Sequence, residues 1–124
     1  MQNNNQSQKS LTSIRKKIVE EKRKYFENYL EYAKKIKEKA IEVLGEARVL
    51  VFGSIVKGNY GPNSDIDVLI ISSKWTGDYE KDRLIKFKIK KLAGVKHPFQ
   101  IHIATPKEFQ NWWQKFIKSD YLEV

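Results

Sequence analysis

Two aspartates separated by one residue follow a glycine–serine pair in the middle of the chain. Gly53 and Ser54 end one β-favouring run, and Asp65 and Asp67 begin the next. Alternate side chains of a strand project from the same face, so both carboxylates would point the same way. Mg2+ is typically held by one or two protein carboxylates together with water and substrate phosphates. The pair is therefore a candidate magnesium site.

The glycine and the serine are suited to binding a phosphate. Gly53 allows the backbone to approach a phosphate closely, and the N–H groups that open the following helical turn would point at it. Ser54 adds a hydroxyl donor, and Lys57 could neutralise phosphate charge. A Gly-Ser turn or an Asp-x-Asp strand end is usually structural when it occurs alone. Together they supply two requirements of nucleotidyl transfer, a triphosphate cradle and carboxylates for Mg2+.

The elements around these residues follow from hydrophobic periodicity and from helix-start and helix-stop signals. Residues 79–93 fit both a strand and a helix, and we expect a helix ended by Gly94. A capping sequence at Thr105 predicts a last helix, with four aromatic residues expected in the core. These are Phe109, Trp112, Trp113 and Phe116. The other expected elements are strands at 47–52, 65–71 and 98–104, a short helix at 54–57 and an edge strand at 121–124.

The N-terminal third has a different composition. Residues 1–10 are rich in Gln, Asn and Ser, which predicts a disordered tail before a single domain at residues 11–124. Within that domain, residues 11–45 form a long amphipathic helix, or two helices in line, and residues 46–124 form the sheet and its helices. Aromatic residues at 25–32 could mark a partner surface, but ordinary packing on the sheet is the favoured interpretation.

Composition limits the classes of function. The chain has 124 residues and a net charge of +9, which favours polyanionic ligands, although a lysine-rich surface without a ligand explains the charge equally well. Cysteine is absent and only two histidines occur, which excludes disulfides and a closed zinc site. No apolar run approaches ~18 residues and no secretory leader is readable, so we expect a cytoplasmic protein without a membrane span.

The run Val51–Ser54, followed after ten residues by Asp65–Val68, resembles the signature of the DNA polymerase beta-like nucleotidyltransferase superfamily. The small size and element order are similar to its minimal nucleotidyltransferases. The resemblance implies an α/β (α+β) fold with a short mixed sheet and helices on one face. It also implies that Ser54 and nearby amides bind the β- and γ-phosphates, that Asp65 and Asp67 hold Mg2+, and that AMP is transferred from ATP. Many relatives are antitoxins that silence a small helical (HEPN-type) toxin by modifying or binding it.

One position departs from that pattern. The superfamily has a third carboxylate on a later strand, and alternation assigns this position to Gln100, which cannot act as a base. His102 shares the same face and could replace the base, stack on a nucleobase or have no role. His97 is expected in a loop.

Three hypotheses remain open at the level of sequence. The chain could be a Mg2+-dependent enzyme that transfers NMP to a hydroxyl of a partner protein. It could be a degenerate module that neutralises a helical toxin by contact, which Gln100 favours. It could also be an RNA-directed nucleotidyltransferase, which the basic clusters at 15–17 and 22–24 favour. A homo-oligomer is compatible with all three.

Overall fold

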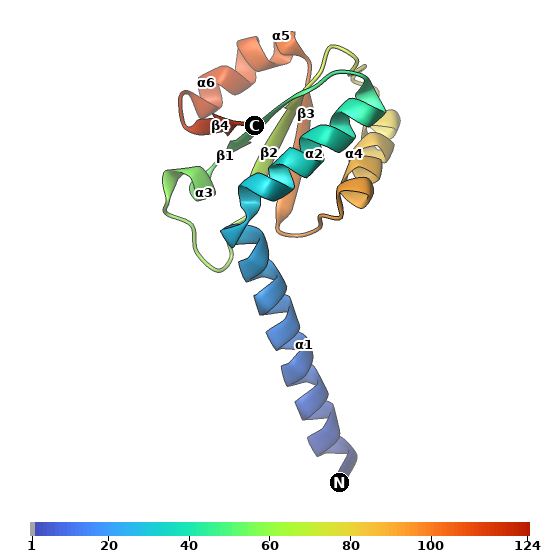
Figure 1. Cartoon of the computed structure of the whole chain (residues 1–124), viewed down its shortest axis with the longest axis vertical. Coiled ribbons are helices and arrows are strands. Elements are labelled where there is room, and N and C mark those ends of the chain that lie inside the picture. Colours follow the sequence, from blue (N-terminus) through green and yellow to red (C-terminus); the bar gives the residue numbers. More distant parts are fainter. Residues whose placement is uncertain (1) are drawn as a thin grey trace.

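A four-stranded mixed sheet lies at the centre of the computed structural model, which describes the backbone of residues 2–124 and the side chains from residue 10 onward (Figure 1). The strands are β1 (Arg48–Phe52), β2 (Ile66–Ile71), β3 (Phe99–Ala104) and β4 (Tyr121–Glu123). Their spatial order is β3-β2-β1-β4. β1 pairs antiparallel with β2 and with β4, whereas β2 and β3 are parallel. The sequence prediction of a mixed sheet with a C-terminal edge strand is confirmed.

The connections follow from this topology. The antiparallel pair β1 and β2 is joined by the single turn of α3 (Ser54–Lys57) and a loop. The parallel pair needs a longer crossover, which is α4 (Tyr79–Ala93). Asp78 caps the start of α4 by accepting hydrogen bonds from the backbone N–H groups of residues 80 and 81, and Gly94 ends the helix in the left-handed conformation. The predicted helix at 79–93 is therefore confirmed.

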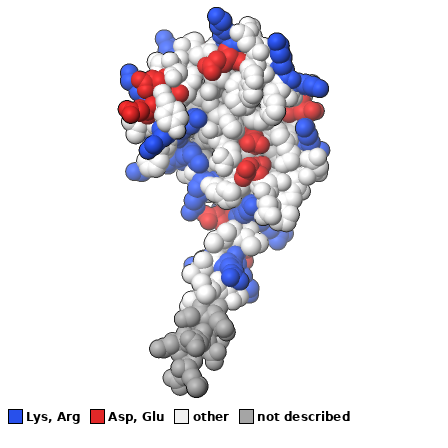
Figure 2. Space-filling view, turned by 180° about the vertical axis from the view of Figure 1, so that it is seen from behind, with Lys and Arg blue, Asp and Glu red and all other residues white. Residues whose placement is uncertain are grey.

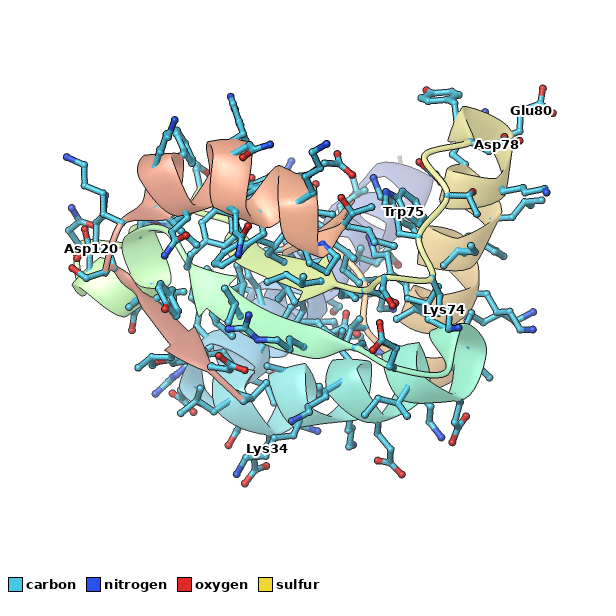
Figure 3. All side chains as sticks on the ribbon, turned by 90° about the horizontal axis from the view of Figure 1, so that it is seen from above. Lys34, Lys74, Trp75, Asp78, Glu80 and Asp120 are labelled. Carbon is cyan, nitrogen blue, oxygen red and sulfur yellow. The ribbon has the colours of Figure 1, made fainter. Side chains whose placement is uncertain are left out.

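Both faces of the sheet are covered, in contrast to the prediction of helices on one face only. α2 (Tyr29–Leu44) and α4 pack on the first face through an apolar stripe of α2 at three- and four-residue steps. The second face carries a C-terminal helical segment made of α5 (Pro106–Glu108), the π-helix η1 (Phe109–Trp113) and α6 (Gln114–Ile117). Figure 3 shows the sheet between α2 and this segment. The cause is the apolar second face of β1 and β2, which buries Phe109 and Ile117.

The four aromatic residues of the last helix were all expected in the protein core, but the structure divides them into a buried or partly buried pair and an exposed pair. Phe109 is buried and Trp113 is partly buried, but Trp112 is 57% exposed and Phe116 is 65% exposed. The prediction assumed an α-helical period, whereas η1 has the wider turn of a π-helix. The buried face therefore passes through Phe109, Trp113 and Ile117 at four-residue steps, and Trp112 and Phe116 fall outside it.

α1 (Gln2–Glu27) and α2 are the two helices in line, with a break at Asn28. α1 projects away from the sheet (Figure 1), and its contacts with the body lie near its C-terminal end. There Glu21 forms an ion pair of 3.2 Å with Lys96, and Tyr25 packs edge-on against Phe99. Tyr25 is buried, as the packing interpretation of the aromatic residues predicted.

The helical backbone of α1 begins at Gln2 and so extends into residues 1–10, for which the sequence predicts a disordered tail. Met1 and the side chains up to residue 9 lie outside the described part of the chain. The disordered tail stays a prediction.

Candidate active site

Gly53 stands at the junction between β1 and α3, where the chain turns sharply. Its φ of +87° and ψ of −158° lie in a region that side-chain-bearing residues rarely adopt. A Cβ atom added to Gly53 would lie 2.6 Å from Oδ2 of Asp67. The missing side chain therefore leaves room for the Asp67 carboxylate to lie directly against the backbone of the turn.

Ser54 begins α3 and is half-buried. The carbonyl of Gly53 accepts hydrogen bonds from the N–H groups of Val56 and Lys57, both at 3.2 Å, which closes the turn. The first N–H groups of such a turn have no partner within the helix, so those of Ser54 and its neighbour are free to meet a phosphate. Lys57 lies at the C-terminal end of the same turn and is exposed.

Asp65 and Asp67 flank the first residue of β2. Both are half-buried, while Ile66 and Val68 are fully buried in the core on the first face. The alternation expected from the sequence is therefore present, and it turns both carboxylates away from α2. Asp67 stands in direct register with Phe52 on one side and with Gln100 on the other. The carboxylate pair thus lies at the beginning of β2, a central strand of the sheet, where the ladder with β1 ends.

Gln100 and His102 lie next to Asp67 on β3, on the same second face. Gln100 is the direct register partner of Asp67 and is exposed. His102 lies two residues further along β3, opposite Leu69, and its Nε2 is 3.5 Å from Oδ1 of Asp67. Its ring also contacts the rings of Phe52 and Trp113, with centroid separations of 5.8 and 5.2 Å. The structure thus brings His102, Gln100 and Asp67 together, whereas the other histidine, His97, is exposed in the connection before β3.

The carboxylate oxygens at this site suit a hard cation that also binds the phosphates of the substrate. Among the described residues, no group of three or more His, Cys, Asp or Glu side chains is placed to hold a metal ion. Two carboxylates meet the requirement of Mg2+, which completes its octahedron with water and substrate phosphates. Figure 2 views the molecule from the side opposite α2 and shows acidic side chains in the middle of this face among mostly uncharged atoms. Lysines and arginines lie mainly toward its periphery.

The aromatic environment of this site was not predicted from the sequence. Trp113 reaches His102 because η1 carries it over the second face of the sheet. The residue types were visible in the sequence, but no periodicity signal distinguishes a π-helical turn from an α-helical one. The only sequence clue was the density of aromatic residues between 109 and 116, which was interpreted as core.

Comparison with known families decides the class of domain. The family model of the nucleotidyltransferase domain matches residues 31–123, which includes the whole sheet and the candidate site. The chain belongs to this nucleotidyltransferase family. Membership implies nucleotidyl transfer with an NTP as substrate, and domains of this family generally use divalent metal ions.

One solved structure agrees with this assignment. One crystal structure, provisionally assigned as a nucleotidyltransferase, is 34% identical, with a TM-score of 0.58, and the match covers 73% of this chain and 95% of that one. A second provisional nucleotidyltransferase, from Sulfolobus solfataricus, is 22% identical with a TM-score of 0.45, and the match covers 78% of this chain and 82% of that one. No functionally curated protein matches the chain. In the described part of the chain, no helix is long and apolar enough to cross a membrane.

Proposed function

We propose that this nucleotidyltransferase transfers AMP from ATP to a hydroxyl group of a partner protein, with Mg2+ held by Asp65 and Asp67. The observation that supports this assignment most directly is the space left by the missing side chain of Gly53, which Oδ2 of Asp67 approaches. A phosphate bound at the turn of Gly53 and Ser54 would therefore lie beside the carboxylates. Bound Mg2+ would neutralise phosphate charge and orient the α-phosphate for attack.

The reaction replaces a phosphoanhydride bond of ATP with a phosphoester bond to the acceptor. The acceptor oxygen forms a bond to the α-phosphorus, the bond from that phosphorus to the bridging oxygen breaks, and pyrophosphate leaves with that oxygen. Ser54 and the first amides of α3 would hold the departing phosphates. The acceptor hydroxyl must also lose its proton. Gln100 cannot accept it, so we assign this role to His102, whose Nε2 lies 3.5 Å from Asp67. The imidazolium formed would be stabilised by that carboxylate.

A second function is favoured by one specific observation. Gln100, rather than a carboxylate, stands in register with Asp67 at the position where the superfamily has its third acid. Loss of that group would slow transfer, since each tenfold loss in rate corresponds to about 1.4 kcal/mol of transition-state stabilisation. In this alternative the chain binds the nucleotide and acts on its partner by contact.

The proposed partner is a small helical protein of the HEPN type, in either function. α1 supports this proposal because its described part carries apolar side chains that are more than half exposed. Leu11, Ile14 and Ile18 recur at helical spacing and are flanked by basic residues. An isolated helix of this kind gains most of its stability from packing on another surface. Charge complementarity then favours an acidic helix as the element that covers it.

The test is incubation with ATP labelled at the α-phosphate and Mg2+, with and without the product of the adjacent gene as the candidate partner. Label on the partner and release of pyrophosphate should be abolished by Asp67→Asn. Glu80→Gln is the matched control, because Glu80 is an exposed carboxylate in the first turn of α4, away from α3 and the start of β2 (Figure 3). His102→Gln should reduce the rate if the imidazole accepts the proton.

The Gln100→Asp variant separates the two functions. If wild type transfers label, the enzyme operates without the usual third acid. If label appears only with Gln100→Asp while wild type still binds the partner, the second function is correct. Label transfer that is unaffected by Asp67→Asn would contradict the assignment of the metal site.

A further inference from the structure

Three aromatic side chains continue outward from the histidine beside Asp67. The ring of His102 contacts Trp113, whose ring lies 4.8 Å from that of Trp112. Trp112 in turn stacks on Phe116, with centroids 5.5 Å apart and planes inclined by 10°. We call His102, Trp113, Trp112 and Phe116 the aromatic row. It runs from the carboxylate site to the surface of the C-terminal helical segment.

The exposure of the aromatic row is not explained by packing. Phe109 and Ile117 already bury the segment against the sheet, whereas more than half of the surface of Trp112 and of Phe116 is open to solvent. Burying large aromatic rings is favourable, so a contiguous exposed group of them marks a binding site more often than an isolated ring does. The π-helical turn creates this exposure, and such turns occur frequently at functional sites.

The order of the strands indicates what the aromatic row would bind. Gly53 and the phosphate-binding turn lie on the β1 side of Asp67, and His102 lies on the β3 side. An NTP with its phosphates at Gly53 and its α-phosphate at Asp67 would therefore extend its nucleoside toward β3. Trp113 lies over this second face, since its ring contacts His102 of β3 as well as Phe52 of β1, and a planar base can stack on an indole or an imidazole.

We propose that the outer part of the aromatic row is the nucleobase subsite, in which the base of the NTP stacks on Trp113 and Trp112. This inference rests on the proposed function, because the phosphates must lie at Gly53 and Asp67. Stacking accepts any base, since every base has a π-face, and the larger rings of purines gain more from it. The subsite would therefore favour ATP and GTP over CTP and UTP.

The test compares two ligands that share phosphates but differ in the base. ATP and inorganic tripolyphosphate, each with Mg2+, are titrated by calorimetry against wild type, Trp112→Ala and Trp113→Ala. Truncation of a stacking ring should weaken ATP binding by about five- to 150-fold and leave tripolyphosphate binding unchanged. Trp113→Phe should restore most of the affinity for ATP. Tyr79→Ala is the matched control, because Tyr79 is an exposed aromatic residue at the start of α4, outside the row.

A fluorescence measurement tests the same subsite directly. Trp75 is buried in the core cluster on the first face, so Trp75→Phe leaves the two indoles of the row as the only tryptophans. In this variant ATP should quench the emission and tripolyphosphate should not. Equal quenching by both ligands would overturn the subsite.

The remaining outcomes separate this proposal from the proposed function. If Asp67→Asn weakens ATP binding but both alanine variants bind ATP as wild type does, the subsite is wrong and the phosphate site stands. If the alanine variants keep ATP affinity and lose label transfer, the aromatic row serves the acceptor, which also overturns the subsite. If wild type binds neither ATP nor tripolyphosphate, both proposals fail.

Discussion

Among the glycine-to-alanine changes in this chain, Gly53→Ala should damage the site most. The added Cβ would lie 2.6 Å from Oδ2 and 3.5 Å from Cγ of Asp67, so the carboxylate must move. The backbone conformation, with φ at +87°, costs an alanine a further penalty of about 1–3 kcal/mol. We expect a loss of about 2–4 kcal/mol in the free energy of unfolding, together with loss of Mg2+-dependent ATP binding.

Gly58→Ala is the matched control for this experiment. Gly58 also has a positive φ, of +78°, but a Cβ there meets nothing within 4 Å. Its cost should therefore be backbone strain alone, about 1–2 kcal/mol, with ATP binding retained. Unfolding in urea measures both free energies, and calorimetry with ATP and Mg2+ measures binding.

A double-mutant cycle isolates the contact between the added methyl group and the carboxylate. In an Asp67→Ala background the clash is absent and only the strain remains, so Gly53→Ala should cost less there than in wild type. Equal costs in the two backgrounds would refute the reasoning, because they would show that the carboxylate does not occupy the space beside Gly53. A cost below about 0.5 kcal/mol in wild type would refute it as well.

Three further outcomes are expected. Ser54→Ala should weaken binding of Mg2+-tripolyphosphate by about three- to tenfold, the loss of one hydrogen bond, and calorimetry would show whether binding instead stays normal. Phe109→Ala should lower the free energy of unfolding by about 3–5 kcal/mol, whereas Phe116→Ala should change it by under about 0.5 kcal/mol; equal effects in urea unfolding would contradict the burial of one and the exposure of the other. The hydrogen bond from Arg48 lowers the pKa of Glu123 below its usual range, so this pair stabilises the fold above the unfolded-state pKa of about 4.3 and loses its effect as pH falls through the lower folded value. The Glu123 side chain is 42% exposed, so the pair should contribute under about 1 kcal/mol. Glu123→Gln should reduce the decrease in the free energy of unfolding at acid pH by that amount, which a pH series of urea unfolding would detect.

Local patterns in the sequence were sufficient to predict most strands of the sheet and the boundaries of the helices that connect them. Alternation placed Asp67 and His102 on one face, and the Thr105 signal gave a helix start whose reciprocal capping bonds are both present. These features depend on neighbours within a few residues, so they are readable without knowing the fold.

Features that depend on contacts across the chain could not be predicted. The sequence shows that Gly53 precedes Asp67 by fourteen positions, but only strand register brings the turn against the carboxylate. The C-terminal helical segment was misjudged because a π-helical turn changes which residues face the sheet. Its location on the second face depends on the apolar face that β1 and β2 offer there.

The break between α1 and α2 at Asn28 bears on where the chain could be divided into two separate parts. The matched domain begins at residue 31, so all of α1 lies before it. Tyr25 nevertheless belongs to the body, because it is buried against Phe99 and Tyr32. A cut or a fusion point placed just before Tyr25 would therefore separate an outer arm from a body that keeps its core. Under the proposed function, exchange of this arm would change the partner and leave the nucleotidyl-transfer site intact.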